Sequence, residues 1–286
     1  MSNPLRSVPL RKYRQNRWET AAADLVAEAP VALSVNGAPW LTFLCTPLDL
    51  EALAVGFLFT EGLIHTAADI DHVRVCPTGD NVDVWLRRSV PRPVVWRRTS
   101  GCTGGATAER GVQSSAEPPA VPLPPGPPLS PAAVSALMQA LLNAQDLYRE
   151  AGGLHSSALT DGARLVLMAE DIGRHNTLDK LAGRCLLEGV ASRGLIVLTT
   201  GRISSEMAQK AIQLGAPAVI SRTAPSALAV SLAEQAGLTL IGYARRDSFN
   251  VYAHPERLSL DDAGLELTLP HAHPSLALEP RPVAGD

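Results

Sequence analysis

The sequence predicts an α/β protein in which a smaller α+β domain precedes a larger α/β domain. Residues 156–243 alternate short apolar runs with helical periodicities, which is typical of helices packed on both faces of a sheet. Residues 1–116 instead hold short strand patterns around one helix. Eight prolines fall within residues 117–131, and such a stretch favours an extended linker. We therefore expect the larger domain over 132–258 and a poorly ordered tail over 259–286.

Composition and charge argue against several classes of protein. With 286 residues, of which 46% are hydrophobic and 19% charged, the chain can bury a substantial core. A net charge of −3 gives no general reason to expect binding to nucleic acid. The N-terminus lacks an apolar signal segment, and no apolar run reaches the roughly 18 residues of a membrane span. We expect a cytoplasmic protein that does not cross a membrane.

The chain begins with a basic segment and a predicted hairpin. Five lysines and arginines precede the first acidic residue, Glu19, which indicates an exposed arm or an edge strand. An arm that binds a partner is the alternative. Strand patterns at 31–35 and 39–44 flank Asn36-Gly37, a pair suited to a two-residue turn in which both positions have positive φ.

One helix and three short strands complete the smaller domain. We expect Thr46 to cap the helix and Pro47 to lie in its first turn. Its apolar face is formed by Leu50, Leu53, Ala54, Phe57 and Leu58. Strands are predicted around 73–75 and 82–86, and another begins at Val94.

The larger domain is predicted to open with a helix after Ser130-Pro131 that ends near Gly152. Strands at 156–159 and 165–169 then form a second hairpin. The remaining elements are expected as helices at 176–187, 205–214 and 226–235, and as strands at 195–199, 218–221, 238–243 and 251–252.

A single thiol stands out within the glycine-rich stretch 99–105. Cys102 lies among glycines, which let a backbone bend sharply. Arg97 and Arg98 precede it, and nearby positive charge favours the reactive thiolate over the thiol. A reactive cysteine and a glycine turn that merely holds a cysteine both explain this pattern. The four cysteines show no C-x-x-C spacing, which argues against a zinc ribbon or a dithiol redox motif.

One polar turn offers a candidate phosphate site. Gly201, Arg202 and Ser204 lie between a predicted strand and a predicted helix, where ligands bind in open α/β sheets. The free N–H groups of a helix N-terminus favour phosphate, although no lysine follows as in a Walker loop. Ordinary capping of the helix explains the same residues equally well.

A second polar turn follows the strand at 238–243. Tyr243 suits stacking on a base, and Asp247 suits accepting hydrogen bonds from a guanine edge. Arginine between them suits bidentate contact with phosphate. The alternative is a charged, solvated turn. The full candidate segment is Tyr243, Ala244, Arg245, Arg246, Asp247 and Ser248.

A third turn, 170–176, joins a strand to a helix. Capping by Asn176 and a surface ion pair explain part of it, but not its dense run of charged side chains. His155 precedes a neighbouring strand and suits a site or a structural role. With no H-E-x-x-H and no P-C-x-x-C motif, we expect no metal site.

Five ordered stretches between Asp24 and Leu258 are distinctive. They read DLVAEAPVALSVNGAP, LAVGFLFTEGLI, EDIGRHNTLDKLAG, TGRISSEMAQKAIQLGAP and LTLIGYARRDSFNVYAHPERL. In these stretches, which span most of the chain, the sequence resembles the formate dehydrogenase accessory sulfurtransferases, the FdhD/NarQ family.

The resemblance implies a sulfurtransferase required for formate dehydrogenase activity. Sulfur from a cysteine desulfurase would be carried as a persulfide on Cys102. It would pass to the bis(molybdopterin guanine dinucleotide) cofactor, bound as a substrate, before that cofactor enters the formate dehydrogenase apoenzyme. The segment 243–248 matches the family's cofactor-binding segment, and we add Gly201, Arg202 and Ser204 as phosphate contacts by inference.

The resemblance also implies a three-layer larger domain similar to cytidine deaminase, without its zinc. Some members carry C-x-x-C in the loop, whereas Gly105 stands at the second position here, so a single-thiol carrier is implied. The alternative function is a chaperone that binds and delivers the cofactor without transferring sulfur. A deaminase-like nucleotide enzyme is a third hypothesis, which the missing zinc ligands disfavour. Exposed sheet edges are compatible with a homodimer.

Overall fold

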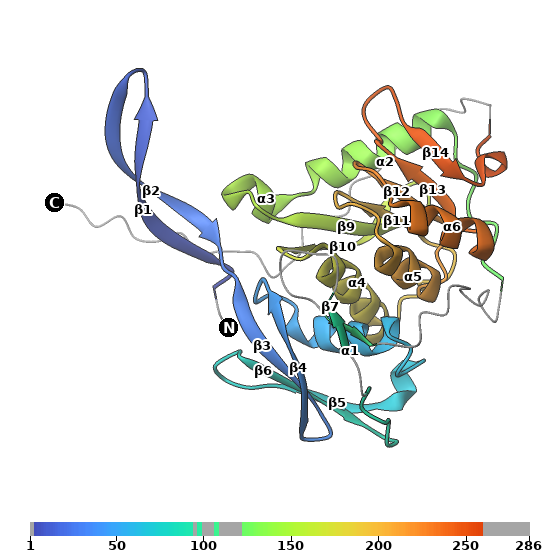
Figure 1. Cartoon of the computed structure of the whole chain (residues 1–286), viewed down its shortest axis with the longest axis horizontal. Helices are drawn as coiled ribbons and strands as arrows, with labels where there is room; N and C mark the ends of the chain where they lie inside the picture. Colours follow the sequence, from blue (N-terminus) through green and yellow to red (C-terminus); the bar gives the residue numbers. More distant parts are fainter. Residues whose placement is uncertain (1–2, 94–95, 99–105, 109–121, 260–286) are drawn as a thin grey trace.

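The computed structural model describes residues 3–93, 96–98, 106–108 and 122–259. Two sheets form the body of the molecule, with helices packed around and between them (Figure 1). A mixed α/β protein is therefore confirmed. The expected linker is described only from residue 122, where Leu123 and Leu129 pack into the cores of the larger domain.

The smaller sheet has the order β4-β3-β6-β5. Its strands are β3 (Ala29–Val35), β4 (Ala38–Cys45), β5 (Ile70–Val75) and β6 (Asn81–Leu86). The predicted hairpin between β3 and β4 is confirmed, since Asn36 and Gly37 have φ of 51° and 77°. Helix α1 (Leu50–Thr60) covers one face of this sheet and supplies part of its apolar core.

The predicted start of α1 is wrong. The N-cap residue is Asp49, which has a φ of 50°, so the helix begins after both Thr46 and Pro47. The reason is a tertiary contact: the Thr46 hydroxyl, the group that would cap a helix, accepts from the Ile172 N–H at 3.2 Å, and the Thr46 N–H donates to Asp171 Oδ2 at 3.1 Å. Contact with the larger domain thus holds Thr46, which therefore does not cap α1.

The larger sheet has the order β10-β9-β11-β12-β13-β14. Its strands are β9 (His155–Thr160), β10 (Leu165–Asp171), β11 (Ile196–Thr199), β12 (Ala218–Ser221), β13 (Thr239–Gly242) and β14 (Asn250–Ala253). β11, β12 and β13 are parallel, whereas β9 is antiparallel to both of its neighbours. The carboxyl ends of the three parallel strands therefore meet at one edge of the sheet.

Helices cover both faces of this sheet, as predicted. Helix α2 (Pro131–Asn143) packs on one face. On the other lie α4 (Arg174–Glu188), α5 (Ser205–Gln213) and α6 (Ala227–Ala236). The Ser130 hydroxyl caps α2 by accepting from Ala133 N, as predicted. The expectation that this helix runs on to Gly152 is wrong, because α2 stops at Asn143 and a separate short helix, α3 (Asp146–Ala151), precedes Gly152.

Two glycines allow close contact between helix α1 of the smaller domain and helix α4 of the larger domain. Helix α1 crosses α4 so closely that a Cβ built on Gly183 would lie 1.9 Å from the Ala52 carbonyl oxygen. On the other helix, a Cβ on Gly56 would lie 1.7 Å from the Asp179 carbonyl oxygen. Only glycine permits backbones to approach this closely. The crossing fixes how the smaller domain sits on the larger one.

The basic segment at the start of the chain forms a long hairpin. β1 (Leu5–Arg14) pairs with β2 (Arg17–Val26) along its whole length and projects from the body (Figure 1). A further short pair is formed by β7 (Trp96–Arg98) and β8 (Ala106–Ala108). Among the described residues, none of the helices is both long and apolar enough to cross a membrane.

Candidate functional site

A pocket of about 390 Å³ lies at the carboxyl edge of the larger sheet. The turns that follow β11 and β12 line it and are bonded to each other, since the Arg222 N–H donates to the Thr199 carbonyl at 3.1 Å. The start of β9 and the segment around α3 complete the wall. The lining residues are Leu142, Gln145, Tyr148, Leu154, His155, Thr200, Arg222 and Thr223.

Positive charge gathers beside this pocket. His155 lines it, and burial together with the charges of Arg174 and Arg202 lowers the pKa of this histidine. Gly201 lies directly against the same group, because a Cβ on it would meet Arg174 Cβ at 2.8 Å and His155 Nδ1 at 3.5 Å. The pocket is therefore an electropositive place in a chain whose net charge is −3. Such a place suits an anionic ligand.

The candidate phosphate turn adjoins the pocket through Thr200, which lines it, whereas Gly201, Arg202 and Ser204 do not. Gly201 is buried, and its carbonyl accepts from Ser221 Oγ at 2.7 Å. Arg202 is exposed. Ser204 is the N-cap of α5, where its hydroxyl accepts from Met207 N and also meets His175 Nε2 at 3.2 Å. Of these three residues, Arg202 has the exposed side chain that a ligand could contact.

The segment 243–248 adjoins the same pocket, although none of its residues lines it. The Tyr243 N–H donates to the carbonyl of the lining residue Thr223 at 3.1 Å. Tyr243 has a φ of 53° and a side chain that is 42% exposed, so its ring is open to a stacking partner. Ala244 is buried, and the four residues after it are exposed: Arg245, Arg246, Asp247 and Ser248.

The third turn contains a buried ion pair. Asp171 is fully buried and forms an ion pair of 2.7 Å with Lys180, which is also fully buried. The predicted cap is wrong: Gly173 is the N-cap of α4, and Asn176 Nδ2 instead donates to Asp171 Oδ1 and to the Leu44 carbonyl. The predicted surface ion pair is thus buried, and the hydrogen bonds that join Asp171 and Lys180 to Thr46 tie the two domains together.

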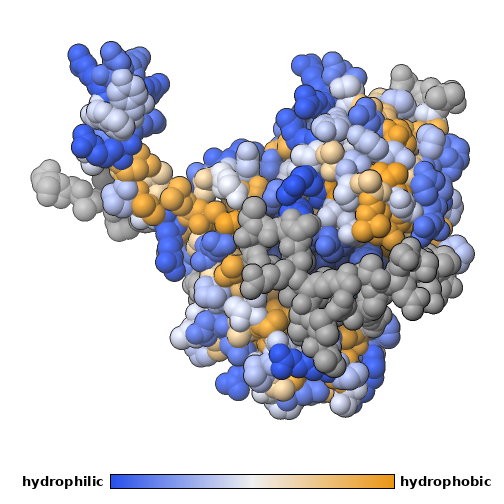
Figure 2. Space-filling view, viewed as in Figure 1, coloured by the Kyte–Doolittle hydropathy of each residue, from blue (hydrophilic) through white to orange (hydrophobic). Residues whose placement is uncertain are grey.

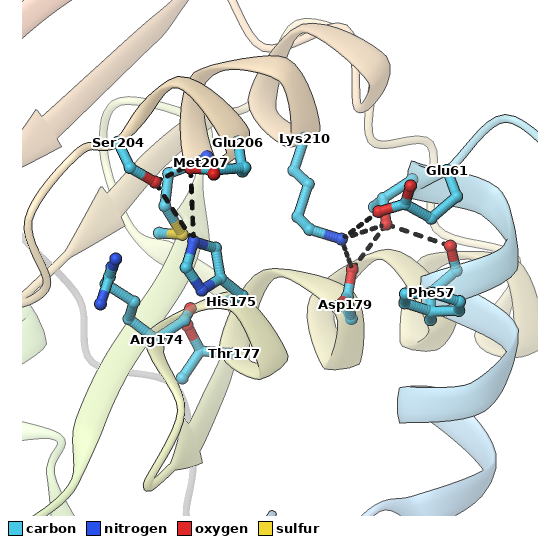
Figure 3. A network of polar contacts seen from close by, with 11 residues as sticks. Phe57, Glu61, Arg174, His175, Thr177, Asp179, Ser204, Glu206, Met207 and Lys210 are labelled. Carbon is cyan, nitrogen blue, oxygen red and sulfur yellow. Dashed lines mark hydrogen bonds and ion pairs between the residues drawn. The ribbon is translucent and has the colours of Figure 1, made fainter. Parts of the chain in front are cut away.

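Sequence reasoning missed a second buried charge cluster, at the junction of α1, α4 and α5 (Figure 3). Lys210 Nζ lies 2.7 Å from Asp179 Oδ1, 3.2 Å from Glu61 Oε1 and 2.9 Å from Thr60 Oγ1. The two carboxylates raise the pKa of Lys210 and keep it charged. One signal was available: Lys210 is spaced with Met207 on the apolar face of its helix, an unusual place for a charge.

His175 lies beside that cluster and stays neutral at physiological pH. Burial, with the positive charges of Arg174 and Lys210, lowers its pKa to about 3. Glu206 Oε2 lies 4.0 Å from Nε2, too far to offset the loss of water. Its Nε2 lies within hydrogen-bond distance of the Ser204 hydroxyl, which caps the N-terminus of α5 beside the candidate phosphate turn.

We expect stability to fall in mild acid because of His175. The unfolded chain binds the proton near pH 6.5, whereas the folded protein does so near pH 3. Between these values the free energy of unfolding therefore decreases as the pH falls, by up to about 1.4 kcal/mol per unit. Urea unfolding at pH 7, 6, 5 and 4 should show a shallower slope for His175→Gln. Ser226→Ala is the control, since it removes the N-cap of α6 and so lowers stability at each pH but keeps the slope; an unchanged slope in His175→Gln contradicts this account.

The cysteines differ sharply in accessibility. Cys102 lies outside the described residues. Burial raises the pKa of Cys45 to about 12 and that of Cys185 to about 11, so both stay protonated. Cys185 lies in the core, as predicted. Cys76 is half-buried and donates to Asp80 Oδ1 at 2.9 Å.

The part of the chain that the structure describes contains no group of three or more histidine, cysteine or acidic side chains arranged to hold a metal ion. Comparison with known proteins then identifies the chain. The model of the FdhD/NarQ family matches residues 26–259. This chain belongs to the FdhD/NarQ family.

Individual FdhD/NarQ relatives agree with that assignment. The sulfur carrier protein FdhD of Bacillus subtilis (strain 168) is 35% identical, over 86% of this chain and 95% of its own length. That of Staphylococcus aureus (strain MRSA252) is 33% identical, over 87% and 95%. A crystal structure from Desulfotalea psychrophila, assigned as a formate dehydrogenase accessory protein, aligns with a TM-score of 0.73 at 29% identity, covering 90% of this chain and all of that one.

Proposed function

We propose that this chain is a cytoplasmic sulfurtransferase that supports the maturation of formate dehydrogenase. It carries sulfur as a persulfide on Cys102 from a cysteine desulfurase to the bis(molybdopterin guanine dinucleotide) cofactor. One observation carries the proposal: the candidate phosphate turn and the segment 243–248 adjoin Thr200 and Thr223, which line one pocket, in a member of the FdhD/NarQ family. A dinucleotide offers a base for Tyr243 and phosphates for the arginines, which is the chemistry these two turns favour.

The first step is an exchange between sulfur atoms. The Cys102 thiolate attacks the outer sulfur of the desulfurase persulfide, a new S–S bond forms, and the desulfurase thiolate leaves as the old S–S bond breaks. No oxidant is needed, because the persulfide sulfur is simply handed on. The high pKa values of Cys45 and Cys185 support the choice of Cys102, since the thiolate is the nucleophile.

We further propose that the larger domain shares the fold of cytidine deaminase without its zinc. Support comes from its three layers, in which helices cover both faces of the six-stranded sheet. In such a sheet, ligands bind beyond the carboxyl ends of the strands, which is where the pocket lies.

Mass spectrometry after incubation with a cysteine desulfurase and cysteine tests the sulfur step. One added sulfur, removable by reductant, is expected on the peptide that contains Cys102. Cys102→Ser should lose it entirely, and the matched control Cys76→Ser should retain it. Sulfur on Cys76 in place of Cys102, or none with a competent donor, contradicts the proposal. The second outcome favours a chaperone that delivers the cofactor without transferring sulfur.

Binding of GDP, measured by calorimetry, tests the placement of the cofactor. Replacing Arg245 and Arg246 together with alanine should weaken binding at least about tenfold, because each removes a charge-assisted hydrogen bond worth about 1.5–3 kcal/mol. Arg164→Ala is the control, since Arg164 is exposed in the β9–β10 turn at Asp161. Equal affinity in the double variant and the wild type places the nucleotide elsewhere.

A further inference from the structure

Gln145 offers the pocket an acceptor that the protein itself does not use. The residue is only 4% exposed, and it lines the pocket at the N-terminus of α3. Its Nε2 atom donates to Ser156 Oγ at 2.7 Å, whereas its side chain makes no capping hydrogen bond to α3. Within the described part of the chain, no group donates to its carbonyl oxygen, Oε1. An unused acceptor in so buried a side chain favours a ligand that donates to it.

Glu170 explains why the side chain of Gln145 is not needed as a cap. Glu170 Oε2 accepts from the Leu147 N–H at 2.9 Å, and Glu170 Oε1 accepts from the Tyr148 N–H at 3.2 Å. These N–H groups belong to the first turn of α3, where the side chain of an N-cap residue ordinarily accepts. A carboxylate from β10 therefore caps α3 and leaves Gln145 Oε1 over.

Ser156 determines which end of the Gln145 amide is left over. It is paired with Glu170 across β9 and β10, and its hydroxyl donates to Glu170 Oε1 at 3.2 Å. Burial raises the pKa of Glu170, but the hydrogen bonds that it accepts oppose this rise. A hydroxyl has a single proton, so Ser156 Oγ can only accept from Gln145, and only the amide nitrogen can donate to it. The reversed amide would bring two acceptors together.

Ser156 also holds a donor at the same pocket. Its N–H donates to Thr200 Oγ1 at 3.0 Å, and the Thr200 N–H donates back to the Ser156 carbonyl at 2.9 Å. Because Thr200 Oγ1 serves as an acceptor there, its own proton is left for a ligand. Gln145 and Thr200 both line the pocket and are both bonded to Ser156. The pocket therefore presents one acceptor and one donor held by a single residue.

The remaining wall of the pocket suits a flat ring. Leu142 and Leu154 supply apolar surface, and Tyr148 supplies an aromatic ring. The exposed surface around α3 is otherwise hydrophilic, so these walls differ from their surroundings (Figure 2). Apolar and aromatic side chains pack on the faces of a base, whereas its edge needs polar partners. The edge of guanine carries N1–H and the 2-amino group as donors and O6 as an acceptor.

We propose that Gln145 is a specificity-determining residue that recognises guanine through Oε1, and that Ser156 and Glu170 are positioning residues that hold it as an acceptor. Oε1 accepts from N1–H and the 2-amino group, and the Thr200 hydroxyl donates to O6. The inference rests on the proposed function, since it assigns a guanine base of the cofactor to this pocket. The exposed arginines of the adjoining segment 243–248 remain available for the phosphates.

Calorimetry with GDP and IDP tests the role of Gln145. IDP differs from GDP only in lacking the 2-amino group. The wild type should bind GDP about tenfold more tightly than IDP, because IDP leaves Oε1 with one donor fewer. Gln145→Leu keeps the size of the side chain and should reduce this ratio to about twofold or less. Gln139→Leu is the matched control, because Gln139 is exposed on α2 and bonded to Asn143, and it should keep the wild-type ratio.

The same ratio tests the positioning residues. Ser156→Ala frees the amide to turn, so the preference for GDP over IDP should fall at least about threefold. Ser157→Ala is the control: Ser157 is equally buried on β9 but is bonded to Thr177 and Thr199, so its loss should lower stability and keep the ratio. A change in packing alone would affect GDP and IDP alike, whereas the loss of a fixed acceptor changes their ratio.

The outcomes separate this inference from the proposed function. Equal binding of GDP and IDP by the wild type, or a ratio that survives Gln145→Leu, overturns the role of Gln145. If Arg245→Ala/Arg246→Ala still weakens GDP binding in that case, the proposed function stands without it. A ratio that survives Ser156→Ala but not Gln145→Leu overturns the positioning role. A wild type that binds neither nucleotide overturns both the inference and the placement of the cofactor.

Discussion

Gly183→Ala should lower the free energy of unfolding by about 3 kcal/mol or more. Alanine inside a helix is otherwise about 1 kcal/mol better than glycine, so the direction of the change is itself informative. Here the new Cβ would lie 1.9 Å from the Ala52 carbonyl oxygen and 2.6 Å from its carbon. Both are backbone atoms, which no rotamer change can move. Helices α1 and α4 must separate, and apolar contacts between the two domains are lost.

Thermal unfolding measures this effect directly. For a chain of this length, a loss of 3 kcal/mol corresponds to a fall in Tm of about 6–12 °C. Gly189→Ala is the control at the end of the same helix, because nothing lies within 4 Å of its Cβ and only its φ of 71° opposes alanine. That control should cost about 1–2 kcal/mol. A Gly183→Ala variant as stable as the wild type would show that the helices do not cross as described.

Local features of the fold were predictable from the sequence. The turn at Asn36-Gly37 depends on two residues that tolerate positive φ, and the cap at Ser130 depends on one hydroxyl and its own helix. Each is decided within a few residues, so no knowledge of the rest of the chain is needed. The α/β class was predictable for the same reason, because the periodicity of apolar residues that distinguishes helices from strands is a local signal.

Features decided by distant residues were not predictable. Thr46 fails as a cap because its hydroxyl accepts from the N–H of Ile172, 126 positions further on. Lys210 reaches Glu61 across 149 positions, so the sequence shows a charge on an apolar face but not its partner. The candidate site was predictable in part. Ligands bind at the carboxyl ends of parallel strands, and this general rule brings Thr200 and Thr223 to one pocket. Which side chains face a ligand depends on packing between distant residues.

The second large effect concerns the buried cluster of Lys210, Asp179 and Glu61. Lys210→Met should lower the free energy of unfolding by about 3–5 kcal/mol, because it leaves two buried carboxylates without their cation. Asp179 and Glu61 are only 3% and 7% exposed, so water cannot replace the ammonium group. Burial already raises the pKa of Asp179 in the wild type, and the loss of Lys210 removes the main opposing charge. Methionine keeps the volume of the side chain, which isolates the electrostatic change.

The pH dependence of Lys210→Met separates this cause from a packing defect. The folded variant takes up protons on its carboxyls at a higher pH than the unfolded chain does, so its stability rises relative to the wild type as the pH falls. Urea unfolding at pH 7 and pH 5 should therefore show a smaller difference at pH 5. Arg164→Met is the control, because its ion pair with Asp161 is exposed and should contribute less than about 1 kcal/mol at either pH. A difference that stays constant with pH would mean that Lys210 acts through packing alone, and that the cluster joins the three helices by shape and not by charge.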